Sequence, residues 1–260
     1  MKILRQVSWS MTKPVALFLI VSTVWLNCLA QKAPRKSAQK PAAPVYKNLT
    51  LANLKTLGEA GDLAAQNEVG LVYALAQKGQ KQDYEEAFKW FRMAAEKGLA
   101  SAQYNLGSLY FYGTGVPKDY EEARRWYRNA ADQGYIPAQY FLGWMYGNGK
   151  GVAESYKEST QWFRKAAEQG DSEAQYSLGL MYLRGEDLNP DYIEAYKWIN
   201  LAAAQGNTNA VKARGKLAVS MTPEQIAEGQ RRASQFSKSP SSATGQKSPP
   251  DAARQRTTVK

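Results

Sequence analysis

Residues 99–134 read LASAQYNLGSLYFYGTGVPKDYEEARRWYRNAADQG, and this stretch decides the fold because the chain repeats it. The next two blocks keep its register: YIPAQYFLGWMYGNGKGVAESYKESTQWFRKAAEQG (135–170) and DSEAQYSLGLMYLRGEDLNPDYIEAYKWINLAAAQG (171–206). An earlier block (62–98) fits with one extra residue, and a degenerate fifth covers 207–236. The blocks end on glycines 36 residues apart, at Gly98, Gly134, Gly170 and Gly206. A fixed period of this size indicates a solenoid of stacked repeats.

Each block predicts two helices joined by a turn. In the first helix, Ala102, Leu106 and Leu109 are spaced by four and three residues, which places them on one helical face. A glycine within this helix costs about 1 kcal/mol relative to alanine, yet it recurs in every block, as Gly70, Gly107, Gly143, Gly179 and Gly215. We expect a partner helix to approach closely at this glycine, with a tryptophan ring packed over it (Trp90, Trp126, Trp162 or Trp198).

The second helix begins with a predicted capping box. The side chain of Asp119 is placed to accept a hydrogen bond from the backbone of the third helical residue, Glu122, whose carboxylate would accept one from the backbone N–H of the cap. The pair recurs as Asp83 and Glu86, Ser155 and Glu158, and Asp191 and Glu194. Because the serine keeps the capping oxygen without the charge, capping is the recurring property. The glycine that ends each block is expected to take a left-handed conformation and stop the helix.

Two repeated features resemble catalytic sites. Gly113 and Gly115 precede a helix start, but a phosphate-binding loop needs a preceding strand and a Gly-Lys-Ser/Thr sequence. Glu121 and Glu122 form a carboxylate pair, but the catalytic pair of a glycosidase is unique rather than repeated. The chain has no histidine, and its single cysteine, Cys28, allows no intrachain disulfide. We therefore expect turns and caps, no enzymatic activity, no cofactor and no metal.

The repeat pattern is similar to that of the Sel1-like repeat family, a relative of the tetratricopeptide repeats. The 36-residue period, the glycine loop, the Asp-Tyr start of the second helix and the AA-x-x-G end match over roughly residues 49–236. The chain departs from the pattern at Asp187, which replaces the second loop glycine, and in the first block, where Gly79 is the only loop glycine. The resemblance implies an all-α fold, a right-handed α-solenoid of tandem helix-turn-helix repeats, and a role as a protein-interaction adaptor. Some cysteine-rich relatives suggest an alternative, an envelope hydrolase acting on cell-wall or β-lactam substrates.

Both ends of the predicted solenoid carry capping elements. LTLANLKTLGEAG (residues 49–61) predicts a capping helix of half a repeat. At the other end, Thr222 is placed as N-cap, with Pro223 at the first helical position and Gln225 at the third. Such helices cover the last apolar face of a solenoid.

The first 30 residues predict an export signal. Basic residues precede an apolar run of 12, VALFLIVSTVWL (15–26), which is shorter than the roughly 20 residues of a membrane-spanning helix. Small residues before Gln31 predict cleavage after Ala30, which would place the protein in the periplasm or outside the cell. The alternatives are a lipoprotein acylated at Cys28, which the preceding Asn27 fits poorly, and an uncleaved amphipathic start. A further alternative function is an envelope-anchored regulatory scaffold held by the basic ends of the chain.

The net charge of +11 is concentrated at the ends of the chain. Residues 1–30 carry +3, 31–48 carry +5 and 237–260 carry +4, so residues 49–236 carry −1. The segment 31–48 is expected to be a Pro/Ala/Lys linker, and 237–260 a disordered tail. No nucleic acid partner is expected. The basic ends are candidates for weak contact with anionic lipids or envelope polymers, the alternative being solvated segments without a ligand.

Positions that differ between the blocks are the candidates for binding another protein. They are spaced by three and four residues on the first helices, which in tandem helix-pair solenoids line the concave surface. The candidates are Asn105, Phe141 and Ser177; Ser108, Trp144 and Leu180; and Tyr112, Asn148 and Arg184. Phe141 and Trp144 are expected to expose large aromatic surface, as binding hot spots do. The alternative is that all nine pack between repeats. We expect a monomer that binds a partner protein.

Overall fold

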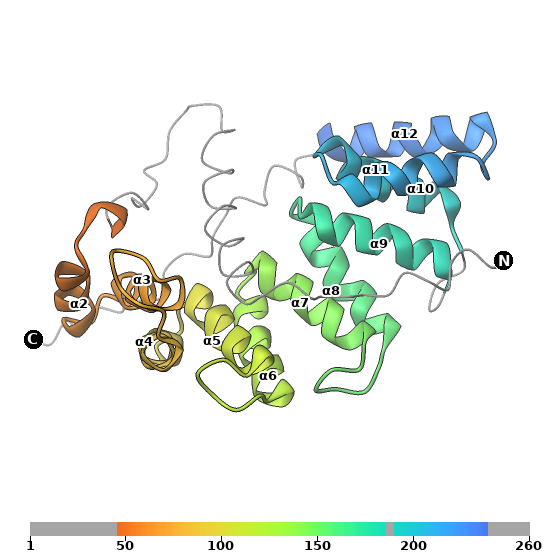
Figure 1. Cartoon of the computed structure of the whole chain (residues 1–260). Helices are drawn as coiled ribbons and strands as arrows, with labels where there is room; N and C mark the ends of the chain where they lie inside the picture. Colours follow the sequence, from red (N-terminus) through yellow and green to blue (C-terminus); the bar gives the residue numbers. More distant parts are fainter. Residues whose placement is uncertain (1–45, 186–189, 239–260) are drawn as a thin grey trace, which may run out of the picture. The chain divides into compact units, whose positions relative to one another are not determined.

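The computed structural model describes residues 46–185 and 190–238 (Figure 1). Within these ranges the chain forms one 3-10 helix, η1 (Tyr46–Asn48), eleven α-helices and no strand, which confirms the predicted all-α class. Among the helices of these ranges, none combines the length and the apolar character needed to cross a membrane. The predicted signal (1–30) and nearly all of the predicted tail (237–260) lie outside the described residues.

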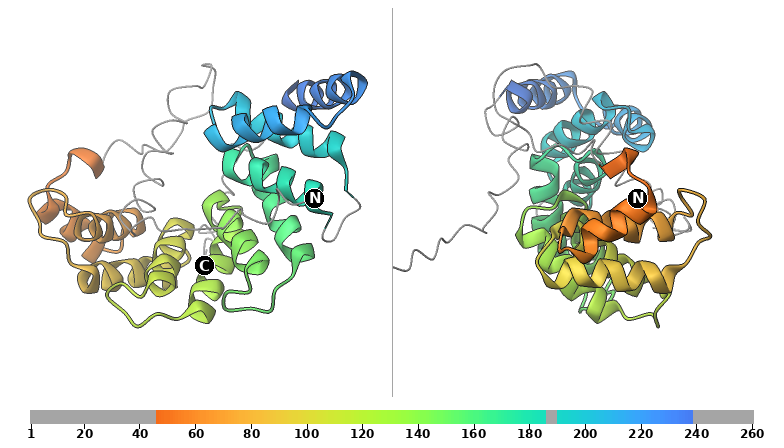
Figure 2. Two further views of the ribbon diagram at one scale, coloured as in Figure 1. Left: turned by 45° about the vertical axis from the view of Figure 1, so that its right-hand side comes forward. Right: turned by 90° about the vertical axis from the view of Figure 1, so that its left-hand side faces the viewer.

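The chain divides into two compact units, Met1–Asp119 and Tyr120–Lys260, and each is described by itself. The first contains η1, α2 (Leu51–Glu59), α3 (Leu63–Ala74), α4 (Tyr84–Glu96) and α5 (Ala100–Tyr112). The second contains α6 (Tyr120–Asp132), α7 (Ile136–Gly147), α8 (Tyr156–Glu168), α9 (Ser172–Arg184), α10 (Tyr192–Ala204), α11 (Thr208–Ala218) and α12 (Pro223–Lys238). Within each unit consecutive helices pack side by side as far as α11, whereas α12 packs against α10 (Figure 2). The result is a tandem array of helix-turn-helix repeats.

The predicted N-terminal capping helix is α2. Its Leu54 is buried in a cluster with Val69, Val72 and Trp90. The hydroxyl of Tyr46 donates to a carboxylate oxygen of Asp62 at 2.7 Å, and its ring packs against the same cluster. Residues 46–48 therefore form the helical turn η1 where the sequence predicts linker, because this tyrosine gains both an apolar and a polar partner.

The first-helix glycine marks a close helix approach at Gly70, Gly143 and Gly179, as predicted, but not at Gly215, and the partner residue differs from the prediction. A Cβ added at Gly70 would lie 2.5 Å from the ring of Phe91, and at Gly143 2.7 Å from the ring of Phe163. The side chain next to the tryptophan fills the gap each time, so the prediction that the tryptophan does so is wrong. Along a helix, the tryptophan and its neighbour point about 100° apart, so only one of them can face the glycine.

The glycine loops are turns that pack against backbone, as the sequence predicts. Gly113 and Gly115 have φ values of 68° and 71°. A Cβ added at Gly115 would lie 2.6 Å from the carbonyl oxygen of Tyr84, at the start of the preceding second helix. Gly151 lies in the same way against the carbonyl of Tyr120. A side chain at these places would collide with main chain, which explains why the loop requires glycine.

The predicted cap residues start the second helices. Asp83, Ser155 and Asp191 each accept a hydrogen bond from the backbone of the third helical residue. Their own backbone N–H groups donate to the carbonyls of aligned tyrosines in the first helices, Tyr73, Tyr146 and Tyr182, at 2.9–3.1 Å. The predicted second bond of the capping box, from the cap N–H to the glutamate carboxylate, is therefore wrong at these three helices, because a first-helix carbonyl already accepts from that N–H. Thr222 and Gln225, at the start of α12, do exchange both bonds, at 3.3 and 3.0 Å.

The glycines that end the blocks take the predicted conformation. Gly98, Gly134, Gly170 and Gly206 have φ values of 93°, 85°, 94° and 86°. This left-handed region is open to glycine at little cost, and it turns the chain out of the helix.

Candidate partner-binding surface

The nine candidate residues lie on α5 in the first unit and on α7 and α9 in the second. Six of them are buried: Asn105, Ser108, Phe141, Trp144, Ser177 and Leu180. Phe141 exposes 2% of its surface and Trp144 exposes 6%. The expectation that these two rings present a large exposed aromatic surface is therefore wrong.

The first candidate position faces the preceding repeat. The amide nitrogen of Asn105 donates to the amide oxygen of Asn67, on α3, at 2.9 Å. One repeat later, the ring of Phe141 stacks on Tyr127, on α6, with centroids 5.3 Å apart. The same position thus makes a polar pair with the first helix of the preceding repeat in one case and an aromatic pair with its second helix in the other. The residues vary because each repeat matches its own neighbour, which is the packing alternative that the sequence left open.

The second candidate position is also covered. The hydroxyl of Ser108 donates to the carbonyl of Tyr104, one helical turn earlier, at 3.0 Å. Leu180, two repeats later, exposes only 8% of its surface. This position contributes local packing, and its side chains offer little area to a partner.

The third candidate position is partly exposed in all three repeats. Tyr112 is the last residue of α5, Asn148 is the C-cap of α7, and Arg184 is the last residue of α9. The amide nitrogen of Asn148 donates to the carbonyl of Trp144 at 2.8 Å, which satisfies a carbonyl in the last turn of the helix. The positive charge of Arg184 lies at a helix C-terminus, where the helix dipole favours cations. These three side chains remain the candidates for partner contact.

Buried glutamines, here called the glutamine column, join successive helices within each unit, and they were not predicted from the sequence. Each glutamine donates from its side-chain amide to a carbonyl at or near the end of the preceding helix. The pairs are Gln66 with Gly58, Gln103 with Ala95, Gln139 with Ala131 and Gln175 with Ala167, at 2.8–3.2 Å. Each of these carbonyls also accepts from the backbone N–H of the glycine three residues later, so the glutamine is a second donor at the helix end. The signal was present, because the glutamine follows the first-helix alanine in all four blocks.

In the second unit the glutamine column is extended by a second set of glutamines. Gln169 donates to the side-chain oxygen of Gln139 at 2.6 Å, and Gln205 donates to that of Gln175 at 2.8 Å. Each column residue in these two repeats therefore links one helix end before it to one helix end after it. The linkage holds the spacing of successive helix pairs.

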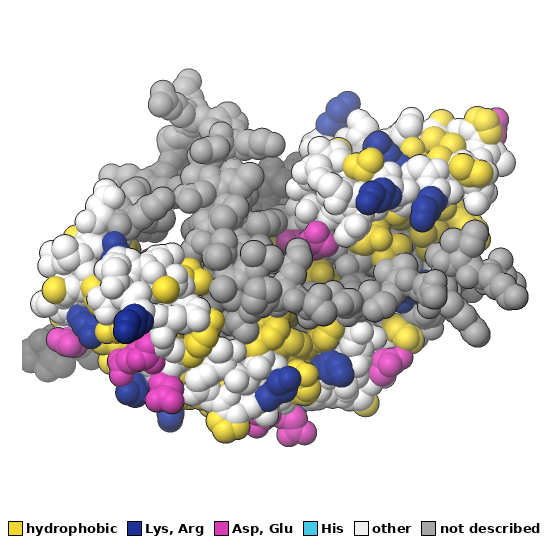
Figure 3. Space-filling model, in the orientation of Figure 1, with side chains coloured by type: hydrophobic (Ala, Val, Ile, Leu, Met, Phe, Trp, Pro, Cys, Tyr) yellow, Lys and Arg dark blue, Asp and Glu magenta, His cyan; other side chains and the backbone are white. Residues whose placement is uncertain are grey.

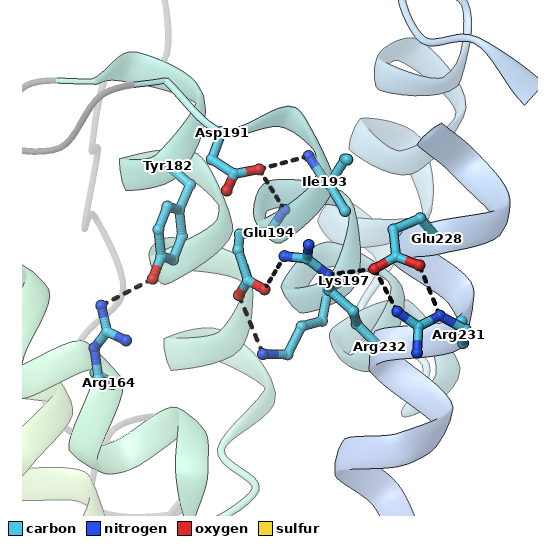
Figure 4. Close-up of polar contacts among 9 residues, drawn as sticks. All are labelled: Arg164, Tyr182, Asp191, Ile193, Glu194, Lys197, Glu228, Arg231 and Arg232. Atoms are coloured by element: carbon cyan, nitrogen blue, oxygen red, sulfur yellow. Dashed lines mark hydrogen bonds and ion pairs between the residues drawn. The ribbon is translucent and has the colours of Figure 1, made fainter. Parts of the chain in front are cut away.

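A charged network attaches α12 to α10 (Figure 4). Glu194 accepts from Arg232 at 2.8 Å and from Lys197 at 3.1 Å. Glu228, on α12 itself, pairs with Arg231 and Arg232, and these two guanidinium groups lower its pKa to about 2. The sequence predicts Glu194 only as a residue of a helix cap. The network is not visible in the sequence, because Arg232 lies 38 residues further along the chain.

Asp171 is the one described carboxylate whose burial shifts its pKa to near neutrality. It is the N-cap of α9, and its side chain accepts from the backbone of Ala174 at 2.6 Å. Burial raises its pKa from 3.8 to about 7. Its contact is with the start of its own helix, so its role here is capping.

The described residues offer no cluster of three or more His, Cys, Asp or Glu side chains that could hold a metal ion. The polar groups that the structure brings together, the glutamine column and the network on α12, are engaged with helix ends and with one another. The geometry defines the class of tandem helix-pair repeat proteins, in which residues that recur in each repeat hold one helix against the next.

The chain belongs to the Sel1 repeat family. The family model for the Sel1 repeat matches residues 63–99, 100–135, 136–171 and 172–207, more than half of the chain. Among solved structures, the chain is similar to a protective antigen present in uropathogenic Escherichia coli strains, which displays an SLR fold, with 28% identity and a TM-score of 0.69. That match covers 81% of this chain but only 44% of the antigen, so the chain spans less than half of that protein.

A second solved structure is similar over most of both chains. It is a Sel1 repeat protein from Oxalobacter formigenes, with 32% identity and a TM-score of 0.62, covering 72% of this chain and 78% of that one. Among curated proteins, no significant match was found.

Proposed function

We propose that this Sel1 repeat protein is a non-catalytic scaffold that binds another protein through the partly exposed ends of its first helices. One observation carries the proposal. Tyr112, in the first unit, and Asn148 and Arg184, in the second, occupy the same position of three repeats, differ in chemistry and are partly exposed. Different side chains at one position of a repeated framework suit a protein partner, which presents different groups to successive repeats.

We further propose that the protein acts in the bacterial envelope or outside the cell. The support is the sequence of residues 1–30, with its basic start, short apolar run and small residues before the predicted cleavage site after Ala30. Mass spectrometry of the protein from a secreting host should find a mature chain that begins at Gln31. A chain that retains an acylated Cys28 would instead show a lipoprotein.

Affinity capture tests the scaffold function. The mature protein is used as bait in an envelope extract, beside a variant with Tyr112→Ala, Asn148→Ala and Arg184→Ala. We expect the variant to lose the captured partner while circular dichroism shows unchanged helix content, since these side chains lie at helix ends. A matched control replaces exposed second-helix residues, Arg125→Ala and Gln161→Ala. Equal capture by bait, variant and control would contradict this assignment.

The alternative function, an envelope hydrolase, remains a prediction from the family resemblance. No particular observation in the structure favours it. Asp171, whose pKa lies near neutrality, caps a helix, and the repeated carboxylates of the second helices cap or pair with neighbours.

A further inference from the structure

The glycine within the first helix of each repeat is called the register glycine. Gly215, the register glycine of the last repeat, lacks the neighbouring side chain that Gly70, Gly143 and Gly179 have. Gly70, Gly143 and Gly179 each lie against a bulky side chain from the second helix of their own repeat, which is Phe91, Phe163 or Ile199. Gly215 occupies the same register on α11, and nothing lies within 4 Å of a Cβ built there. Among the described residues, the place that a second helix fills at Gly70, Gly143 and Gly179 is open on α11.

The second helix of the last repeat is engaged elsewhere. α12 packs against α10, where Gly229 lies beside Tyr196 and the ring of Phe236 meets Trp198 edge-on, with centroids 5.1 Å apart. The ion pair between Arg232 and Glu194 holds α12 in the same place. Of the helices in residues 46–185 and 190–238, none covers the Gly215 side of α11.

An apolar stripe runs along this open side. Val211 and Val219 lie four residues before and after Gly215, so the three residues share one helical face. Val211 exposes 46% and Val219 exposes 87% of its surface. At the Val211 position, the aligned Gln139 and Gln175 expose only 4% and 2%. We call Val211, Gly215 and Val219 the open face of α11.

Positive charge flanks the open face. Lys212 and Lys216 are exposed, and α11 contains no acidic residue. Residues 208–238 hold six basic and two acidic side chains, and Figure 3 shows basic and hydrophobic side chains near one another at this end of the second unit. An occupant must therefore be apolar on one side and acidic beside it. The chain's own residues 239–260, with four basic groups and one acidic, have the wrong charge.

We propose that the open face of α11 binds an acidic amphipathic helix of a partner protein, with an aromatic or branched side chain seated over Gly215. The partner helix would take the place that the second helix takes in the other repeats, a helix-in-groove mode of recognition. The proposal rests on the proposed function, because it takes this chain to bind proteins, but it uses different residues from Tyr112, Asn148 and Arg184.

The probe is a capped peptide with the sequence of residues 83–98, DYEEAFKWFRMAAEKG, carrying K89E and R92E to make it acidic. This is the second helix of the first repeat, whose Phe91 covers Gly70. Titration of the labelled peptide with the mature full chain, followed by fluorescence anisotropy, should give saturable binding with a Kd on the order of 100 μM. Gly215→Leu in the protein, or F91A in the peptide, should weaken binding by about tenfold or more.

The control variant is Gln230→Leu, which adds the same side chain at an exposed place on α12 and should bind like wild type. Circular dichroism should show Gly215→Leu fully helical, since the site has room for a side chain. Absence of binding up to about 1 mM, or binding that Gly215→Leu leaves unchanged, overturns the proposal.

Two other occupants of the open face of α11 would give different results, and either result would also overturn the proposal. Dimerisation in sedimentation velocity that Gly215→Leu abolishes would assign the open face to a second copy. Peptide binding only after deletion of residues 239–260 would assign it to the chain's own end. Affinity capture that depends on Tyr112, Asn148 and Arg184 would stand in both cases, so the proposed function and this proposal can fail separately.

Discussion

At the scale of single residues, the register glycines give opposite predictions for one substitution. A Cβ at Gly143 or Gly179 would lie 2.7 Å from Phe163 or 2.6 Å from Ile199. Gly143→Ala and Gly179→Ala should therefore lower the free energy of unfolding by about 1–3 kcal/mol through overpacking. Gly215→Ala meets no neighbour and should raise it by up to about 1 kcal/mol through helix propensity. Urea unfolding measures all three, and a loss at Gly215→Ala equal to the others would contradict the open face of α11.

Asp171 predicts a pH dependence of stability. Its pKa in the folded chain, about 7, lies above its ordinary value of 3.8, so the folded state binds the proton more tightly than the unfolded state. This contribution is complete below about pH 4 and is lost as the pH rises to about 7, so the free energy of unfolding falls across that window. Asn207 is the uncharged N-cap of α11, and its side-chain oxygen accepts a hydrogen bond from the backbone N–H of Ala210 at 3.0 Å.

Asp171→Asn should therefore remove this part of the pH dependence. It should also raise the free energy of unfolding at pH 8 by more than about 1 kcal/mol, because no charge is buried. Urea unfolding at pH 5 and pH 8 compares the two proteins. If both change equally between these pH values, the carboxyl is not the group responsible.

At the scale of helices, the glutamine column predicts that replacing one of its glutamines lowers the free energy of unfolding, although helix propensity alone predicts little change. Gln139→Leu keeps a helix former of similar size, but it leaves the carbonyl of Ala131 and the amide of Gln169 without this partner. Loss of such buried hydrogen bonds should lower the free energy of unfolding by about 1–3 kcal/mol. Gln161→Leu, at an exposed place on α8, is the matched control and should change it by less than about 0.5 kcal/mol. Equal effects in urea unfolding would show that the column does not bind the repeats.

At the scale of the whole molecule, removal of α12 should destabilise one end of the array. A chain truncated after Ser220 loses the contacts of Gly229, Arg232 and Phe236 with α10. Because each repeat contacts only its neighbours, hydrogen exchange should quicken in α10 and α11 and stay slow in α3 and α4. Deletion of residues 239–260 alone is the control, with an unchanged Tm expected. Uniform loss of protection along the chain would contradict the repeat-by-repeat picture.

Most of the fold could be predicted from the sequence, because the repeats allow each residue to be compared with the residues at the same position in the other repeats. Ser155 beside Asp83 and Asp191 identifies a capping oxygen, and the structure places all three at helix starts. The same comparison is ambiguous for positions that vary, since variation arises both from a binding surface and from packing between unlike neighbours. Phe141 varies because of packing between unlike neighbours, since its ring stacks on Tyr127 of the preceding repeat.

By itself, the sequence determined the helix pairs, their turns and their caps, because these depend on residues within one or two helical turns of each other. Only the tertiary structure decided which side chain covers each register glycine, how the buried glutamines join successive repeats, and that α12 lies on α10 and leaves the Gly215 side of α11 open. These depend on the direction in which each helix presents its side chains to another helix. A one-dimensional period gives the spacing of the repeats, but packing between them fixes which surfaces remain for a partner.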